Sequence, residues 1–153
     1  MRLHRIALAK HSATVAAAFD GQGGLHGHGR WHVRGKLIVY TADHTALAMA
    51  EALVHLQRSN SIEAFNHWEI EVPDALILST PALPPKWKHD VPLTQSFGDA
   101  WLSARKSVAL VVPSALVPND LNCLINPAHP QFDIRWVVAG PNPFYFDPRL
   151  TRP

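Results

Sequence analysis

Residues 36–56 read KLIVYTADHTALAMAEALVHL and join two segments of opposite character. Residues 36–41 are rich in β-branched and aromatic side chains, which predicts a strand that ends near Tyr40. Asp43 is a good N-cap residue, and the alanines and leucines after it predict a helix over about 44–57. This stretch is therefore expected to form a strand, a short turn and a helix.

The predicted helix is apolar on every face except at Glu51 and, one turn later, at His55. Glu51 lies on a stripe with the spacing of a core-facing surface, so its carboxylate is expected to be desolvated. The other members of this stripe are Leu47, Ala50 and Val54. Two interpretations stay open: the carboxylate pairs with His55 or an arginine for structure alone, or it serves a reaction that develops positive charge.

Outside this stretch, short apolar segments alternate with proline and glycine turns. Strands are predicted at residues 3–8, 65–72, 107–112, 122–126 and 132–138, and a second helix from residue 93 or 94 to 105. A glycine-rich loop over 21–29 and a proline-rich loop over 81–88 are expected to stay irregular. Short strands around two helices favour an α+β fold over a doubly wound sheet. Neither a GxGxxG motif nor a P-loop is present.

The composition is that of an ordinary globular protein. Of the 153 residues, 47% are hydrophobic and 17% charged, which suits one compact domain over residues 1–153. The formal net charge is +2, and no basic run is interleaved with aromatics, so we expect no nucleic-acid binding by this chain. One cysteine, Cys123, excludes an intramolecular disulfide and favours a reducing, cytoplasmic location. No apolar run suits a signal peptide or a membrane span, so no membrane association is expected.

Three more polar residues stand at the ends of predicted elements. Arg30 follows glycines, so the backbone can approach a ligand while the guanidinium offers a planar fork for phosphate or carboxylate. Tyr40 closes a strand, where a phenol can stack on a planar ring or hydrogen-bond a phosphate. Ser114 ends another strand without the GxSxG context of a hydrolase nucleophile. A surface arginine and a core tyrosine are the structural alternatives, and Trp31 is predicted to pack in the core.

Histidines gather in the glycine-rich loop. His26, His28 and His32 form an HxHxxxH pattern, with His44 and His55 as more distant companions. Such side chains bind zinc, but neither HExxH nor paired cysteines accompany them. We therefore expect loop histidines and no metal site, with a non-enzymatic, histidine-based metal-binding module as an alternative.

Several short segments occur in a characteristic order along nearly the whole chain. They are LHRI (3–6), GRW (29–31), VYTA (39–42), AEALVHL (50–56), GDAWL (98–102), VPS (112–114), NPAHP (126–130) and FYFDPRL (144–150). In this order they resemble the RES-domain family, bacterial toxins named for an arginine, a glutamate and a serine. After Trp31 the family usually has a small polar residue and a proline, whereas this chain has His32, Val33 and Arg34.

The resemblance implies a fold similar to that of ADP-ribosyltransferases and cleavage of NAD at the nicotinamide–ribose bond. Phosphate, water or a protein side chain would accept the ADP-ribosyl group, so NAD is expected as a substrate, with inorganic phosphate as a potential co-substrate and no cofactor. The expected catalytic residues are Glu51, Arg30 and Ser114. The expected substrate-binding residues are Arg30, Tyr40, Ser114 and Asn126.

Specific roles follow from the same resemblance. Arg30 would hold the NAD pyrophosphate and Tyr40 would pack against the nicotinamide end. Ser114 would hydrogen-bond the bound ligand near the reacting centre. Glu51 would stabilise the oxocarbenium-like ribose as nicotinamide leaves.

A toxin that consumes NAD also implies a cognate Xre-like antitoxin that blocks the cleft. Family members commonly dimerise, so a homodimer is a further expectation. One alternative is transfer of ADP-ribose to a specific cellular protein, which would yield a labelled protein band. Another is a toxin that acts on RNA, which would degrade RNA without loss of NAD.

Overall fold

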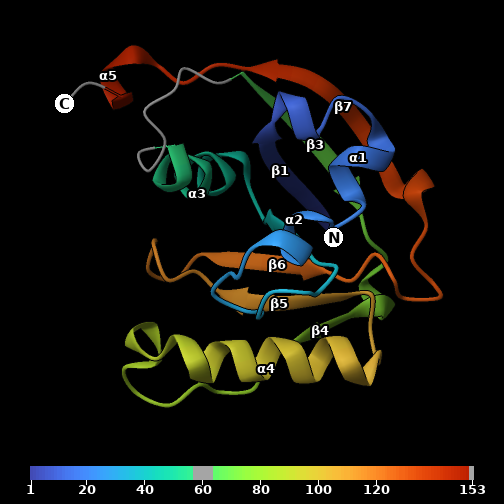
Figure 1. Ribbon diagram of the computed structural model, residues 1–153, viewed down its shortest axis with the longest axis vertical. Coiled ribbons are helices and arrows are strands. Elements are labelled where there is room, and N and C mark those ends of the chain that lie inside the picture. Colours follow the sequence, from blue (N-terminus) through green and yellow to red (C-terminus); the bar gives the residue numbers. More distant parts are fainter. Residues whose placement is uncertain (57–63, 152–153) are drawn as a thin grey trace.

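One seven-stranded sheet runs through the described residues, 1–56 and 64–151, of the computed structural model (Figure 1). The strands are β1 (Arg2–Leu8), β2 (Val39–Ala42), β3 (Phe65–Glu71), β4 (Ile77–Ser79), β5 (Ala109–Pro113), β6 (Leu121–Ile125) and β7 (Val137–Phe144). The helices are α1 (Val15–Phe19), α2 (Gly23–His26), α3 (Thr45–Leu56), α4 (Val91–Ala104) and α5 (Pro148–Thr151). Short 3-10 turns are η1 (Ala9–His11), η2 (Asp74–Leu76), η3 (Trp87–His89) and η4 (Ile134–Trp136). The expected α+β class is confirmed.

The sheet consists of two halves that meet at β1 and β2. The strand order is β4-β5-β6-β2-β1-β3-β7, with only β4 and β5 parallel among the described pairs. β1 pairs with β3 over its whole length, whereas β1 and β2 are paired at one position, His4 opposite Ala42. Figure 1 shows α4 against the half that contains β4, β5 and β6, and α3 on the opposite side of that half, beside β1.

Two apolar clusters cover the two faces of β5 and β6. Alternate residues of a strand point to opposite faces, so Cys123 and Ile125 of β6 join one cluster while Leu124 joins the other. The first cluster includes Trp68, whose ring meets that of Phe19 edge to face at a centroid distance of 6.2 Å. The second packs α4 onto β5 and β6, and Trp31 is buried within it, as expected.

The C-terminal strand differs from the prediction. Residues 132–138 were expected to form a strand, but the chain forms η4 there, and β7 starts only at Val137. β7 then continues to Phe144 through Pro141 and Pro143, residues that normally argue against a strand. They are tolerated because β7 is an edge strand, where a missing N–H need not meet a neighbour.

The glycine-rich loop is more regular than expected, since Gly23–His26 forms one helical turn. Carbonyls of this loop accept backbone N–H groups that a longer β2 would use for strand pairing. The Lys36 N–H donates to Gly24 O at 3.3 Å, and the Ile38 N–H donates to Gly21 O at 3.3 Å. The strand predicted from residue 36 therefore begins only at Val39.

The predicted helix ends also need correction. His44, and not Asp43, caps α3, because the Leu47 N–H donates to His44 Nδ1 at 3.2 Å while the Asp43 N–H donates to Leu121 O of β6 at 3.2 Å. The predicted end at Gln57 lies outside the described residues. α4 begins earlier than expected, at Val91, with Asp90 as its N-cap.

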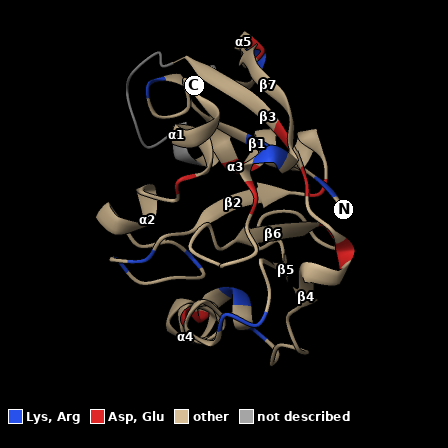
Figure 2. Ribbon diagram, turned by 90° about the vertical axis from the view of Figure 1, so that its right-hand side faces the viewer, with Lys and Arg blue, Asp and Glu red and all other residues tan. Residues whose placement is uncertain are grey.

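The ribbon of Figure 2 shows basic and acidic positions dispersed along the chain, without a long continuous basic segment. None of the helices in the described ranges has the length and apolar character needed to cross a bilayer.

Candidate active site

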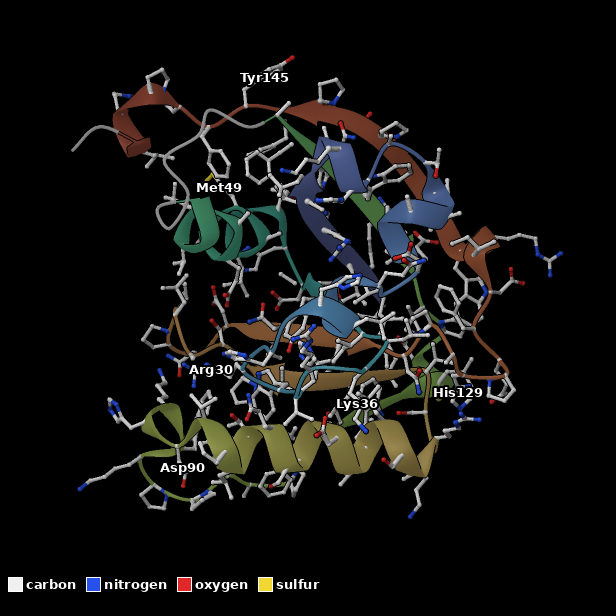
Figure 3. All side chains as sticks on the ribbon, viewed as in Figure 1. Arg30, Lys36, Met49, Asp90, His129 and Tyr145 are labelled. Carbon is white, nitrogen blue, oxygen red and sulfur yellow. The ribbon has the colours of Figure 1, made fainter. Side chains whose placement is uncertain are left out.

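Arg30 lies in a tight turn against α4, and Figure 3 shows it in the space between α3 and α4. Its Nη1 donates to the carbonyl of Lys88 at 2.9 Å, and Thr94 Oγ1 donates to the Arg30 carbonyl at 2.6 Å. The turn can touch the helix because Gly98 has no side chain: a Cβ there would overlap the carbonyl oxygen of Trp31. The guanidinium is thus presented by backbone that is fixed on α4.

Tyr40 on β2 points its phenol at the same turn. Its Oη accepts the N–H of Trp31 at 3.2 Å and lies 2.7 Å from His32 Nδ1. A Cβ at Gly29 would overlap this oxygen, so the close approach requires glycine there. Burial raises the pKa of Tyr40, and the charges of Arg30 and Glu51 act on the phenol in opposite directions. The phenol therefore stays protonated at neutral pH.

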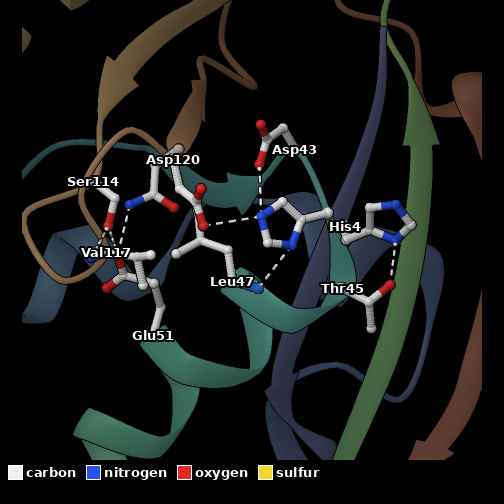
Figure 4. Close-up of polar contacts among 10 residues, drawn as sticks. His4, Asp43, Thr45, Leu47, Glu51, Ser114, Val117 and Asp120 are labelled. Carbon is white, nitrogen blue, oxygen red and sulfur yellow. Dashed lines mark hydrogen bonds and ion pairs between the residues drawn. The ribbon is translucent and has the colours of Figure 1, made fainter.

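Glu51 extends from α3 toward the β5–β6 loop (Figure 4). Its Oε1 accepts Asn122 Nδ2 at 2.6 Å and Ser114 Oγ at 3.2 Å. The side chain is half-buried, so its expected desolvation is partial. Among the described residues no cation pairs with Glu51 and no partner meets its Oε2, whereas the side chain of His55, the other expected partner, lies outside the description.

Ser114 is a fixed hydrogen-bond donor to Glu51. It is 2% exposed, and its Oγ accepts the N–H groups of Leu116 at 3.1 Å and Val117 at 3.0 Å. A hydroxyl has one donor and two acceptor positions, so its single proton is left for the carboxylate. This arrangement orients Glu51, and the two backbone N–H groups occupy the lone pairs with which a nucleophilic oxygen would attack.

A second contact ties the start of α3 to the same loop. Because His44 Nδ1 accepts the Leu47 N–H, the ring proton belongs on Nε2, which donates to Asp120 Oδ2 at 3.1 Å (Figure 4). The Asp120 carbonyl in turn accepts the N–H of Ser114 at 2.8 Å. α3 is therefore held to the β5–β6 loop at both His44 and Glu51.

The sequence motifs and this geometry agree with a comparison to known families, in which residues 2–147 match the RES domain. The chain belongs to the RES-domain family. Two RES relatives are both named Toxin Res. The relative from Yersinia enterocolitica is 36% identical to this chain, over 98% of this chain and 99% of the relative's length. The one from Pseudomonas putida is 39% identical over 75% of this chain and 81% of its own.

A further relative and a solved structure are also similar to this chain. The Prs ADP-ribosylating toxin of a Sphingobium species is 38% identical over 87% of this chain and 86% of its own. A chain in the crystal structure of the M. tuberculosis MbcT–MbcA toxin-antitoxin complex has a TM-score of 0.63 at 21% identity, covering 81% of this chain and 72% of that one. The expected family is confirmed, and a chain of this toxin-antitoxin complex shares the α+β fold.

Asn126 lies apart from the other expected site residues of this RES domain. It follows β6 at the end opposite Asn122, and four strand residues span about 13 Å. Its Oδ1 accepts the Ala128 N–H at 3.1 Å, which forms a turn. The side chain lines an open depression of about 530 Å³ together with Lys36 and Arg105. Its substrate-binding role stays a prediction that this placement does not support.

Two residues near Glu51 and Tyr40 were missed in the sequence. Asn122 was assigned only to a strand, because its contact with Glu51 joins residues 71 apart. Arg5 donates from Nη1 to the Tyr40 carbonyl at 3.0 Å, and its Nε is buried without a partner among the described residues. Burial lowers the pKa of Arg5 to about 10. The sequence pattern could have indicated Arg5, because it is a charged residue two positions after the buried Leu3 and therefore on the same, core-facing side of β1.

The loop histidines do not assemble the zinc site considered as an alternative. His32 is buried and turned to Tyr40, whereas His26 and His28 are exposed. Burial lowers the pKa of His32, which therefore acts as a neutral support for the phenol.

Proposed function

We propose that this RES-domain chain is the toxin of a toxin–antitoxin pair and that it cleaves NAD between nicotinamide and ribose. The arrangement of Glu51 carries the proposal: two neutral donors fix its Oε1, and within the described residues its Oε2 has no hydrogen-bond partner and is available to a ligand. The names of the Yersinia, Pseudomonas and Sphingobium relatives support a toxic, ADP-ribosyl-transferring activity.

In the proposed reaction the ribose C1–nicotinamide N bond breaks and its electron pair leaves with nicotinamide. The ribose carbon becomes electron-poor and is captured by an oxygen of water, phosphate or a protein side chain, which then loses its proton. Glu51 stabilises the developing positive charge, an effect that is stronger in a partly desolvated site than in water. Arg30 pairs with the pyrophosphate, and the Tyr40 phenol contacts the nicotinamide end.

Product analysis tests this proposal. Purified chain is incubated with NAD, with and without inorganic phosphate, and the products are separated by chromatography. Free nicotinamide is expected in both cases, with ADP-ribose from hydrolysis or its 1-phosphate from phosphorolysis. Unchanged NAD in the presence of folded chain, or RNA degradation without NAD loss, would refute NAD cleavage.

A second candidate is transfer of ADP-ribose to a specific protein, which the name of the Sphingobium relative favours. Both candidates share the bond that breaks and differ in the acceptor. Radiolabelled NAD added to a cell extract separates them: a discrete labelled protein band indicates transfer, whereas small labelled products alone indicate NAD degradation.

The same proposal includes a cognate Xre-like antitoxin, a cytoplasmic location and a homodimer. The toxin–antitoxin complex with a similar fold supports the antitoxin part at the level of architecture. Expression of the chain alone is expected to stop growth, and co-expression of the neighbouring helix-turn-helix gene product to restore it. Size-exclusion chromatography with light scattering gives the oligomeric state.

A further inference from the structure

Three potential metal ligands meet on β1 and β3, away from the Glu51 site. His4 lies directly opposite Glu69 in the strand pairing, and His67 is two residues before Glu69, on the same face of β3. One ligand atom from each of the three lies within 4.8 Å of the other two. No other such group occurs in the chain segments that the structure describes.

The two imidazoles form a hydrogen-bonded pair. His4 Nδ1 and His67 Nε2 are 3.1 Å apart, and the ring planes differ by 6° with centroids 5.4 Å apart. The distance between the ring centroids is longer than the N–N distance by about the sum of the two ring radii. Both nitrogens therefore lie on the line between the two centroids and point at each other. A single hydrogen between them holds two good ligands together.

A further oxygen lies beside the histidine pair. Thr45 Oγ1, at the first turn of α3, is 3.1 Å from His4 Nδ1 (Figure 4). Arg2 Nη1 is 3.4 Å from Glu69 Oε2, a long contact on a mostly exposed guanidinium. All three ligand residues are half-buried, which limits competition from water and still permits entry.

We propose that His4, His67 and Glu69 bind a divalent transition-metal ion, with Zn²⁺ the best match. Tetrahedral zinc with bonds of about 2.0–2.2 Å places its ligand atoms roughly 3.3–3.5 Å apart, close to the observed N–N distance. Binding requires each ring to turn its lone pair toward a common point, and the ring that donates the shared hydrogen to change tautomer. Three protein ligands leave a fourth position for water or the Thr45 hydroxyl.

The bound ion would connect β1, β3 and the start of α3. No residue of the site belongs to the proposed NAD chemistry, so the metal proposal and the NAD proposal fail or succeed separately. The pairing of β1 with β3 already fixes the backbone positions of all three ligands, which reduces the ordering cost of binding.

The test is a calorimetric titration of Zn²⁺ into tag-free chain that has been dialysed against a chelator. One ion per chain is expected, and His67→Gln is expected to weaken binding by at least about 10- to 100-fold. Zn²⁺ at a hundred-fold excess over its Kd should also raise the Tm by roughly 5–10 °C in the unmodified chain, and the same Zn²⁺ concentration should raise it by about half of that or less in His67→Gln.

The matched control is the double variant His26→Gln/His28→Gln, which removes two exposed histidines and should bind Zn²⁺ like the unmodified chain. Glu69→Gln provides a second test if His67→Gln does not fold, as judged by circular dichroism in chelator. Binding that is lost in the control and kept in His67→Gln would assign the metal to the glycine-rich loop. No binding by the unmodified chain would leave a hydrogen-bonded histidine pair only, and both results overturn the proposal.

Discussion

At the level of single residues, the two hydrogen-bond partners that the described part of the chain gives Glu51 are neutral. Asn122 and Ser114 fix the orientation of the carboxylate without cancelling its charge, whereas a salt bridge would offset the charge that the proposed reaction needs. The side chain of His55 lies outside the described residues, so the structural interpretation stays open beside the catalytic one.

Glu51→Gln is expected to lower the kcat of NAD consumption by about 100-fold or more, an effect of about 3 kcal/mol on the transition state. KM should change little, because the charge acts mainly on the transition state. Steady-state kinetics measure both constants, with the exposed Glu71→Gln as the matched control. Equal turnover in the two variants would remove Glu51 from the mechanism.

His32 makes the fold sensitive to acid. Burial lowers its pKa in the folded chain, so the unfolded chain takes up a proton first as the pH falls below about 6.5. Its contribution to stability is complete above that pH and is lost as the pH falls toward the folded value. Urea denaturation at pH 7.5 and 5.5 should show this loss, with a smaller difference in His32→Phe. An equal difference in that variant would place the acid sensitivity elsewhere, for example at His4, whose pKa burial also lowers.

At the level of elements, the site depends on how closely α4 approaches the turn that carries Arg30. Gly98 permits the contact with Trp31, and Gln95 Nε2 and Thr94 Oγ1 donate to the carbonyls of Gly29 and Arg30 at 2.9 and 2.6 Å. One helix face thus positions the turn without supplying a side chain to the ligand.

Gly98→Ala is expected to push the turn away from α4 because the added Cβ overlaps backbone, which cannot move aside as a side chain can. A cost of about 1–3 kcal/mol in unfolding free energy is expected, together with weaker NAD binding. Gly23→Ala is the matched control, since its Cβ meets nothing within 4 Å and alanine favours the helical turn of α2. Chemical denaturation and NAD titration measure the two effects, and equal stability of both variants would contradict this account.

Sequence patterns predicted the elements that depend on local periodicity. The α3 helix, the strand before it and the buried strand β5 follow from apolar spacing, and Glu51 stood out as a charge within such a pattern. Features that depend on tertiary pairing were missed: Asn122 needs β6 beside α3, and β7 tolerates its prolines only at a sheet edge. The sequence pattern also favoured Asp43 as the N-cap of α3, whereas the Leu47 N–H donates to His44 Nδ1.

At the level of the whole molecule, the reactivity of the Cys123 thiol measures how often the sheet opens. It lies on β6 between β2 and β5, with 0% exposure, and Thr41 Oγ1 donates to its carbonyl at 2.7 Å. Burial raises the pKa of its thiol to about 12. The thiol is therefore protonated and inaccessible in the folded chain.

A thiol-specific chromogenic reagent at pH 8 is expected to label Cys123 only through opening of the sheet, so the rate should rise steeply with urea. Stability should also fall above about pH 9, because the unfolded thiol ionises there while the folded one does not. Cys123→Ala gives the background rate. Labelling of the native chain as fast as of the urea-unfolded chain would contradict the buried position.

The hydrogen bonds of Glu51 also have a consequence for biosynthesis. Ser114 and Asn122 follow it by 63 and 71 residues, and translation proceeds from the N-terminus. A nascent or truncated chain that ends before Ser114 contains the carboxylate but neither of its donors. Under the proposed function, such an incomplete chain does not harm the cell that synthesises it. The time between synthesis of Glu51 and synthesis of its donors also gives an antitoxin time to bind.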